Sequence, residues 1–477
     1  MEQIDNTQII VEIREHLSRN EIKEACKLLN KLYKKDKKNP LVRFWKCLIE
    51  NIDLLSLYKK VPTKKLRNDL EKGVHNCVKI IESLSPDSRK VFVLQEWHTI
   101  KLLIGTIVVA NLSKSLALHL VDMVLEVNPN HYEALFTKTT ILEDIGRIEE
   151  AINICQEVLT RRPDDIWFMS RLATCYALLG WKKMNTKEEN VEYYFNEAKS
   201  IAERILKRDP HNCKAKEIIA SVIGIKGDIS AALKMIDEAL QTGECEHDFG
   251  LLRLKADLLR DSGEYEEALE IYNELLDVNK LDTNVWNGLT EMWLAIGEYK
   301  KALESAKMAY FLNPYNTEVI INYVNALRKN KKYKEVQRIL NNALKLYPNN
   351  LDFLLEKAIS ELVAGKYEEA KKNYLKIVSL NPSRANISVW WPVWFGLGYI
   401  EYVNGNYSKA MEYARRALKF NPTASDSLDL MAKIYIKQGE IQKALECYKK
   451  IYETSENPHA RKIALKKIKE LETSLEE

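Results

Sequence analysis

Two residues of this sequence have the types and spacing that could begin a metal site. Cys245 and His247 carry a thiol and an imidazole, both ligands of Zn²⁺, with a single residue between them. A structural zinc site needs four such ligands, and no matching pair of Cys or His follows these two along the chain. We therefore expect no bound metal.

The cysteines as a group favour an intracellular protein. They show no CxxC pair and no spacing typical of a disulfide framework, which indicates reduced, mostly buried thiols of a cytoplasmic protein. The first residues, MEQIDNTQII, lack the basic and apolar regions of a secretory signal. The most apolar stretch, 102–112, is much shorter than the roughly 20 residues of a membrane-spanning helix, so we expect no membrane span. The eight cysteines are Cys26, Cys47, Cys77, Cys155, Cys175, Cys213, Cys245 and Cys447.

Sequence motifs of known catalytic sites are missing. There is no Gly-rich phosphate loop, no HExxH and no GxSxG. The formal net charge is +4, from 72 basic and 68 acidic residues, which is too balanced to indicate a nucleic-acid or membrane surface. These features favour a protein that is not an enzyme, needs no cofactor and binds no nucleic acid.

Small residues recur along most of the chain with a fixed period. Successive members are mostly 34 residues apart, and the exceptions are steps of 47, 36 and 40 residues. A period of this length is typical of stacked helical repeats, in which a small residue lets two helices cross closely. The series consists of Ala117, Ala151, Ala198, Ala232, Ala268, Ala302, Val336, Ala370, Ala410 and Ala444.

Two further series follow the same period. Prolines lie twelve residues after the small residue in most repeats, where they would end the second helix. Glycines lie five residues before it, except around the longest step, and are expected in the left-handed conformation that closes the first helix. Each repeat is thus predicted to be helix, turn, helix and stop. The turn series consists of Gly146, Gly180, Gly227, Gly263, Gly297, Lys331, Gly365, Gly405 and Gly439.

One repeat, from Thr283 to Asn316, shows the full pattern: Trp286, Leu289, Thr290, Trp293, Gly297, Tyr299, Ala302 and Pro314. This set resembles the tetratricopeptide repeat. The resemblance implies an all-α fold, an α-solenoid of about 12 helical hairpins in a right-handed superhelix with a C-terminal capping helix. The nearest alternative, the RNA-reading pentatricopeptide repeat, has a period of 35 residues, and the recurring Pro and Tyr positions favour the tetratricopeptide interpretation.

The repeats divide the chain into three parts. Residues 1–97 are expected to hold two degenerate hairpins, one carrying Ala25 and ending near Pro40 and the other running to Pro86. Residues 459–477 form one apolar stripe on a charged helix, which indicates a cap over the last repeat. The ten repeats between them are 98–131, 132–165, 166–212, 213–248, 249–282, 283–316, 317–350, 351–384, 391–424 and 425–458.

The longest step adds about thirteen residues between Gly180 and Ala198. Thr186 and Glu189 form a capping-box pattern there, so the second helix of that repeat is expected to begin early and to overhang its neighbours. Such a helix end is either a partner site or decoration.

The resemblance also indicates which residues face a partner, because the first helix of each repeat usually lines a concave groove in this family. Two consecutive repeats offer polar candidates there, Asn284, Asn287, Glu291, Asn325 and Arg328. Asparagine amides could hydrogen-bond the backbone of a bound peptide whatever its sequence, or could simply be solvated.

The next two repeats offer apolar candidates. Exposed aromatic clusters often anchor partner chains, and the alternative is that these residues pack under neighbouring helices. Trp394 matches the core tryptophan of the family, whereas Trp390 and Trp391 have no such role and are the strongest candidates for partner contact. The apolar candidates are Leu355, Ile359, Leu362, Trp390, Trp391, Phe395, Tyr399 and Tyr402.

One mode of partner binding is not expected. Co-chaperone members of the family grip a C-terminal carboxylate with Lys, Asn and Arg side chains from three consecutive repeats. The corresponding positions hold Arg253 and Asp257, then Gly288, then Ile321 and Asn325, so this clamp is absent. The sequence therefore predicts a scaffold or adaptor that binds a partner peptide or helix in its groove. The alternatives are an RNA-binding helical repeat and a self-assembling structural solenoid.

Overall fold

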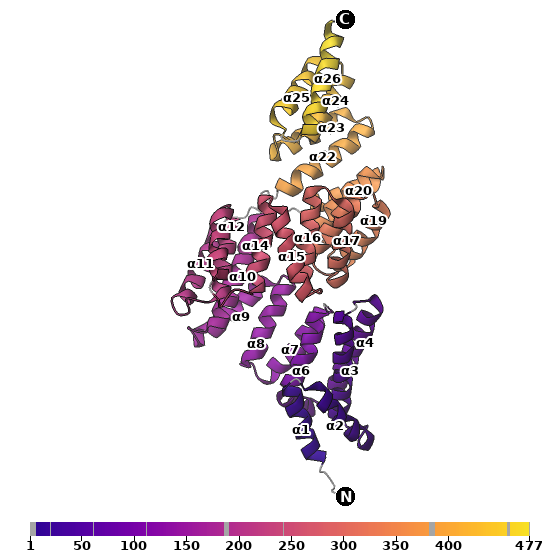
Figure 1. Ribbon diagram of the computed structural model, residues 1–477. Helices are drawn as coiled ribbons and strands as arrows, with labels where there is room; N and C mark the ends of the chain where they lie inside the picture. Colours follow the sequence, from indigo (N-terminus) through magenta and orange to yellow (C-terminus); the bar gives the residue numbers. More distant parts are fainter. Residues whose placement is uncertain are drawn as a thin grey trace. The chain divides into compact units, whose positions relative to one another are not determined.

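The computed structural model describes residues 6–19, 21–60, 62–110, 112–185, 190–241, 243–380, 387–455 and 458–476. These residues form 26 α-helices and no strand (Figure 1). In chain order the helices are α1 (Asn6–Ser18), α2 (Ile22–Lys35), α3 (Pro40–Lys60), α4 (Lys64–Glu82), α5 (Pro86–Gln95), α6 (Trp97–Val109), α7 (Lys114–Val127), α8 (Tyr132–Asp144), α9 (Ile148–Arg161), α10 (Ile166–Asn185), α11 (Val191–Leu206), α12 (Cys213–Ile225), α13 (Ile229–Gln241), α14 (Phe249–Ser262), α15 (Tyr265–Val278), α16 (Thr283–Ile296), α17 (Tyr299–Leu312), α18 (Thr317–Lys329), α19 (Tyr333–Leu346), α20 (Leu351–Val363), α21 (Tyr367–Ser379), α22 (Ile387–Val403), α23 (Tyr407–Phe420), α24 (Ser425–Lys437), α25 (Ile441–Thr454) and α26 (Pro458–Glu476).

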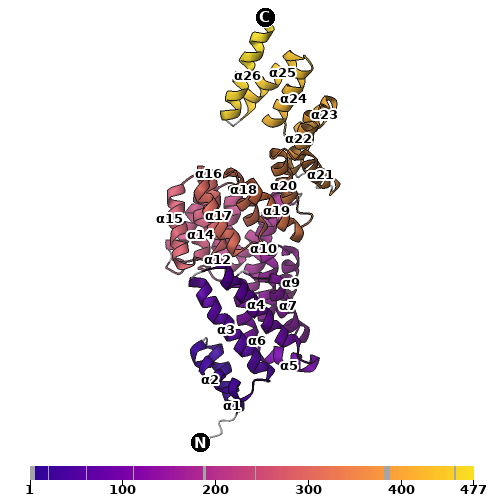
Figure 2. The same cartoon turned by 90° about the vertical axis from the view of Figure 1, so that its right-hand side faces the viewer.

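The described residues divide into two compact units. The first contains residues 1–181, 190–292 and 307–316, and the second contains residues 182–189, 293–306 and 317–477. Along the chain the helices follow one another as twelve hairpins, with only α5 and α26 outside them among the helices described. The fold is the predicted all-α solenoid. Within the second unit, α24, α25 and α26 lie side by side, and α26 packs against the last hairpin (Figure 2).

The periodic small residues lie where the helices cross. All ten members of the series, from Ala117 to Ala444, are fully buried. A larger side chain at these positions would push the two helices of a hairpin apart, which explains why the period is kept by Ala and once by Val.

The turn residues have the predicted backbone conformation in all but one case. Seven of the glycines have φ between 73° and 96°, and Lys331 takes the same left-handed region with φ of 58°. Gly180 is the exception, because it lies inside α10 and closes no helix. A Cβ atom at Gly180 would lie 2.8 Å from the ring of Phe195 on α11, so this glycine allows two helices to approach closely.

The inserted residues lengthen both helices of their repeat. The second helix, α11, begins seven residues before Ala198, whereas α15 begins three residues before Ala268, so the early start is confirmed. The first helix, α10, has 20 residues, compared with 14 in α14, which was not predicted. Thr186 and Glu189 lie outside the described residues.

The N-terminal part contains a helix that the repeat pattern did not predict. The short helix α5 precedes α6 and packs against α4, α6 and α7. Between α5 and α6 the buried carboxylate of Glu96 accepts hydrogen bonds from Trp45 Nε1 (3.0 Å) and Thr99 Oγ1 (2.9 Å) and pairs with Arg14 (2.6 Å). No single described helix is long and apolar enough to cross a membrane; α5 and α6 reach that length only together, across a bend of 82°.

A second unpredicted feature of the first unit joins residues far apart in the sequence. Tyr58, at the end of α3, is fully buried, and its ring centroid lies 6.2 Å from that of Phe311 near the end of α17. The Arg67 guanidinium at the start of α4 donates a hydrogen bond to the carbonyl of Phe311. The tip of the α3–α4 hairpin is thus held against a repeat about 250 residues later.

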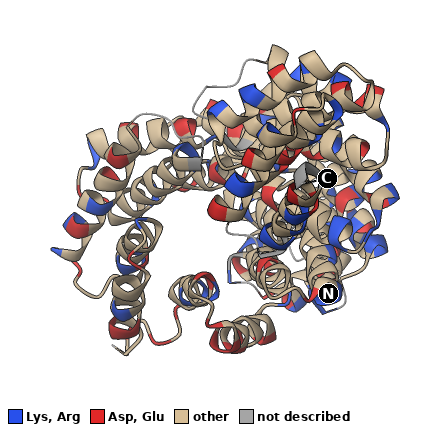
Figure 3. Cartoon of the chain, turned by 90° about the horizontal axis from the view of Figure 1, so that it is seen from above, with Lys and Arg blue, Asp and Glu red and all other residues tan. Residues whose placement is uncertain are grey.

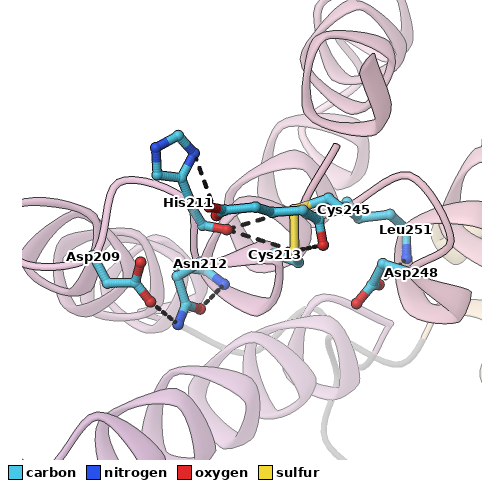
Figure 4. The surroundings of a disulfide bond; sticks show 9 residues. Asp209, His211, Asn212, Cys213, Cys245, Asp248 and Leu251 are labelled. Atoms are coloured by element: carbon cyan, nitrogen blue, oxygen red, sulfur yellow. Dashed lines mark hydrogen bonds and ion pairs between the residues drawn. A yellow bond between two sulfur atoms is a disulfide. The ribbon is translucent and has the colours of Figure 1, made fainter. Parts of the chain in front are cut away.

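The structure corrects one expectation about the cysteines. Cys213 and Cys245 are joined by a disulfide, with their Cα atoms 5.7 Å apart (Figure 4). Because α12 and α13 form an antiparallel hairpin, the residue that begins the first helix meets a residue that follows the second. The carbonyl of His211 lies 3.5 Å from each of the two sulfur atoms. Among the described residues, no three or more of His, Cys, Asp and Glu are grouped so that they could hold a metal ion.

Candidate partner-binding faces

The polar candidates of the first unit belong to a network of ion pairs. Asn287 on α16 is buried and donates from Nδ2 to Glu291 Oε1 (3.3 Å). Glu291 pairs in turn with the guanidinium of Arg260 on α14 (2.9 Å). Asn284 is exposed, and its backbone amide donates to Asp282 (2.9 Å). The Asn287 amide therefore already binds a side chain of its own helix, and the predicted peptide contact fits Asn284 better.

The same network extends to the partly buried carboxylate of Asp257. Arg260 lies 3.2 Å from Asp257 Oδ1, and the Tyr272 hydroxyl donates to the same oxygen at 2.6 Å. Burial raises the pKa of the Asp257 carboxyl, while Arg260 and the hydrogen bond from Tyr272 act in the opposite direction. The charged groups on this face thus hold one another in place.

In the second unit the polar candidates form a similar chain. Arg328 on α18 donates to Asn325 Oδ1 (2.8 Å) and pairs with Glu356 on α20 (3.0 Å). Burial raises the pKa of the Glu356 carboxyl, and the guanidinium of Arg328 opposes that rise. Asn325 and Arg328 therefore connect two consecutive repeats.

The apolar candidates of the second unit lie on α20 and α22. Leu355, Ile359 and Leu362 are partly buried on α20. On α22, Phe395, Tyr399 and Tyr402 are also partly buried, and with Tyr407 at the start of α23 they form what we call the aromatic row.

Neighbouring rings of the aromatic row are in contact along its length. Ring centroids lie 6.2 Å apart for Phe395 and Tyr399, 6.5 Å for Tyr399 and Tyr402, and 5.7 Å for Tyr402 and Tyr407. On one side the rings pack against a small core of α23 and α24 that includes Met411. Each ring is therefore held in position while part of its surface stays accessible.

A charged pair on the next repeat lies beside the aromatic row. Lys433 on α24 contacts Asp429 Oδ2 (2.7 Å), and the Tyr448 hydroxyl donates to Asp429 Oδ1 (3.1 Å). Burial disfavours the ammonium form, but the hydrogen bond to Asp429 raises the pKa of Lys433, and Tyr399 and Tyr402 add to the rise. The aromatic row thus has a fixed cation next to it.

The tryptophans ahead of the aromatic row do not form an exposed pair. Trp390 has only 6% of its surface exposed and stacks on Trp394 (5.7 Å) and Phe420 (5.9 Å). Phe420 of the neighbouring helix covers the ring of Trp390, which disfavours the predicted partner contact. Trp391 is partly exposed and stays a candidate. Trp394 is also stacked on Tyr413 (5.7 Å), as a structural residue would be.

Comparison with known proteins identifies the repeats. The sequence-family model for the TPR domain of cytochrome c-type biogenesis protein H matches residues 251–386. Two family models for the tetratricopeptide repeat match residues 391–424 and 425–458. The chain is a multi-repeat tetratricopeptide (TPR) protein.

The sequence matches between this TPR protein and its relatives cover only part of each relative. It is 25% identical over 332 residues to a TPR repeat-containing protein of Methanocaldococcus jannaschii, covering 68% of this chain and 52% of that protein. It is 26% identical over 232 residues to the human protein O-mannosyl-transferase TMTC1, covering 46% of this chain and 24% of that protein. The chain thus spans about half the length of the first relative and about a quarter of the second.

A solved structure supports the fold. The Cut9–Hcn1 hetero-tetramer of APC/C contains a chain that aligns with a TM-score of 0.52 at 13% identity, covering 98% of this chain and 96% of that one. At this level of identity the likeness concerns the fold alone.

Two consecutive repeats of this TPR protein carry a buried glutamate at the same position. Glu361 accepts a hydrogen bond from Asn373 Nδ2 (2.6 Å), and Glu401 pairs with Lys371 (2.8 Å) and accepts from Asn406 Nδ2 (2.7 Å). The recurrence of an acid 40 residues later, one repeat on, is the signal that could have shown both.

Proposed function

We propose that this TPR protein is a non-enzymatic scaffold that binds a peptide or helix of a partner protein, with the aromatic row as its main contact. The observation that supports the proposal most is the state of these rings, each packed on one side and accessible on the other. Aromatic anchors held in this way bury a large area on binding and lose little side-chain entropy.

The polar faces would contribute specificity. Arg328, Glu356 and Lys433 are held by hydrogen bonds and ion pairs within the protein, so their charges have fixed positions. A partner with matching charges would be favoured over one without them. On the aromatic row, the ammonium of Lys433 would favour a partner segment with an acidic or carbonyl group beside its apolar residues.

The relatives are consistent with a scaffold but leave the enzyme question to experiment. The name of the human relative describes a transferase, yet the match covers only 24% of that protein. The residues of this chain that match the human relative belong to its helical repeats. Nothing in the described residues indicates a transferase activity.

A photo-crosslinking experiment tests the proposal directly. Benzoylphenylalanine at position 399 should crosslink a partner in an extract of the native cell, whereas the same group at position 452 should not. Tyr452 is the matched control, because it is an exposed tyrosine on the second helix of a repeat.

The affinity of the partner identified in this way gives the decisive measurement. Replacing Tyr399 and Tyr402 by Ala should weaken binding at least about tenfold, since each anchor contributes on the order of 2 kcal/mol. Tyr452→Ala should leave the affinity unchanged, and helical circular dichroism should be the same for all variants. Equal affinity of the wild type and the double variant would refute the aromatic row as the contact.

The two other functions predicted from the sequence have their own measurements. Acidic and basic residues are interspersed along the described helices (Figure 3), which disfavours binding to an RNA backbone. Fluorescence anisotropy with a labelled RNA at low salt would detect that function. Light scattering over a range of concentrations would detect self-association.

The location of the protein is also a proposal. We infer a cytoplasmic location from the scattered cysteines of the sequence, whereas a disulfide such as Cys213–Cys245 is rare in reducing compartments. Alkylating free thiols at the moment of cell lysis and mapping both cysteines would decide between these two inferences.

A further inference from the structure

Two thiols and one amide meet between α3 and α4, apart from the residues of the proposed scaffold function. Cys47 lies on α3 and Cys77 on α4, and the two helices pack against each other. Asn51, one helical turn after Cys47, has 1% of its surface exposed. Its Nδ2 lies 3.4 Å from Cys77 Sγ and 3.8 Å from Cys47 Sγ. Both sulfur atoms therefore share one amide nitrogen.

The orientation of this amide is fixed by a third contact. Asn51 Nδ2 donates to the backbone carbonyl of Cys47 at 2.8 Å. A carbonyl oxygen can only accept a hydrogen bond, so the nitrogen of the amide and not its oxygen must lie on this side. The second hydrogen of the same nitrogen is then available to the sulfur atoms. Donors placed in this way stabilise a thiolate relative to a thiol.

The packing around Asn51 is built for this amide. A Cβ atom at Gly73 of α4 would lie 2.2 Å from Asn51 Oδ1, so a side chain at position 73 would displace the amide. Asn51 Oδ1 itself is buried with no hydrogen-bond partner among the described residues, which is unfavourable for a polar atom. An aliphatic residue would avoid this cost, which indicates that the amide does more than fill space.

The two thiols differ in access and in acidity. Cys47 is partly exposed, whereas Cys77 is fully buried. The hydrogen bond from Cys77 lowers the pKa of Cys47, and burial raises the pKa of Cys77. An accessible, acidified thiol in contact with a second, protected thiol is the arrangement found where cysteines react with peroxides.

We propose that Cys47 and Cys77 form a thiol-oxidation site whose substrate is a hydroperoxide. The Cys47 thiolate attacks one peroxide oxygen, an S–O bond forms, the O–O bond breaks, and the leaving oxygen takes a proton as water or an alcohol. The Cys77 sulfur then attacks the Cys47 sulfur, an S–S bond forms, the S–O bond breaks, and the hydroxide takes the Cys77 proton and leaves as water. Two thiols are oxidised by two electrons, and one peroxide is reduced.

The chain supplies a matched control for this proposal. Cys26 on α2 is also partly exposed and also has an asparagine four residues later, with Asn30 Nδ2 3.7 Å from its sulfur. Within the described structure, however, its sulfur has no hydrogen bond to a second cysteine. Cys47 Sγ also lies 3.3 Å from the carbonyl of Gly73, so Cys26 controls for partial exposure and for the neighbouring asparagine.

The test uses the full chain, reduced with a phosphine and freed of reductant without air. One equivalent of hydrogen peroxide is added, the remaining thiols are alkylated at successive times, and the peptides are analysed by mass spectrometry without reduction. We expect a Cys47–Cys77 disulfide peptide, and loss of the free Cys47 thiol at least about tenfold faster than loss of the free Cys26 thiol, because only Cys47 lies beside a second cysteine that can complete the disulfide. Loss of Cys47 no faster than Cys26 would overturn the proposal, and this comparison requires no variant.

Two variants separate the chemical steps. In Cys77→Ser the reaction should stop at the Cys47 sulfenic acid, which dimedone traps, and helical circular dichroism shows whether this variant folds. In Asn51→Leu the rate of Cys47 loss should fall, because the amide donor is gone. A Cys77→Ser chain that folds and gives no dimedone adduct at Cys47 would contradict the assigned order of the two thiols.

Discussion

Replacing Lys331 by Gly is expected to stabilise the repeat that contains it. Lys331 lies two residues after the end of α18 with φ of 58°, in the region that the turn glycines of the other repeats occupy. Its amide donates to the carbonyl of Arg328 (2.9 Å), and the next amide, of Lys332, donates to Leu327 (2.9 Å), so the left-handed conformation is set by the helix end. A residue with a Cβ atom pays a steric penalty there.

The magnitude follows from two opposing terms. The left-handed conformation costs a residue with a Cβ atom roughly 1–2 kcal/mol. Glycine in turn loses more conformational entropy on folding, by about 0.5–1 kcal/mol. The net gain for Lys331→Gly therefore lies between roughly 0 and 1.5 kcal/mol, with a central value of about 0.75 kcal/mol. The exposed side chain of Lys331 has no described contact that would reduce this gain.

Lys334→Gly is the matched control, because Lys334 is an exposed residue of the same repeat but lies within α19. There glycine replaces a helical residue and should destabilise by about 0.5–1 kcal/mol. Urea unfolding followed by circular dichroism, with hydrogen exchange of α18 and α19, should show shifts of opposite sign for the two variants. Destabilisation by both would refute the assignment of strain to Lys331.

Three further changes have expected outcomes. Ala268→Leu should destabilise the protein by about 1–3 kcal/mol, because the helix crossing has no space for a larger side chain. The same change at its exposed neighbour, Glu267→Leu, should change the free energy of unfolding by less than about 0.5 kcal/mol in a thermal unfolding experiment. Similar effects of the two substitutions would contradict the close crossing. Reduction of the Cys213–Cys245 disulfide should lower the urea stability of its repeat by about 3 kcal/mol, and a phosphine should have no such effect on Cys213→Ser/Cys245→Ser. The hydrogen bond from Lys371 lowers the pKa of Glu401 in the folded protein. The ionised Glu401 therefore stabilises the fold at pH values above its unfolded pKa, and this stabilisation is lost as the pH falls through its folded pKa. The stability difference between wild type and Glu401→Gln should therefore be largest at neutral pH and shrink below pH of about 4, and a difference independent of pH would contradict this.

The repeat period predicted those parts of the fold that depend on local geometry. A small residue at a helix crossing and a glycine at a turn have the same requirement in every repeat, so Ala268 or Gly263 could be placed without a structure. Gly180 was misplaced because the insertion after it moved the turn, and glycine serves close packing against Phe195 as well as turns. Composition alone does not distinguish the two uses.

Features that depend on packing against another helix could not be predicted from the sequence. Trp390 and Trp391 are adjacent and chemically identical, yet only Trp390 is covered, because Trp394 and Phe420 stack on it. The contact of Tyr58 with Phe311 joins residues that a nearest-neighbour repeat pattern never brings together. The Cys213–Cys245 disulfide needed knowledge of where α12 begins and where the chain returns after α13.

The polar and aromatic faces should respond differently to a partner. In the first unit Arg260 already pairs with Asp257 and Glu291, so a partner that binds these groups must replace existing ion pairs and gains little net free energy. Rings of the aromatic row such as Tyr399 lose no contact when a partner covers their accessible side, so the free energy of burial is not offset in this way. Affinity should therefore depend mainly on the aromatic row, whereas truncating Arg260 should mainly destabilise its own repeat by leaving the partly buried Asp257 without its cation.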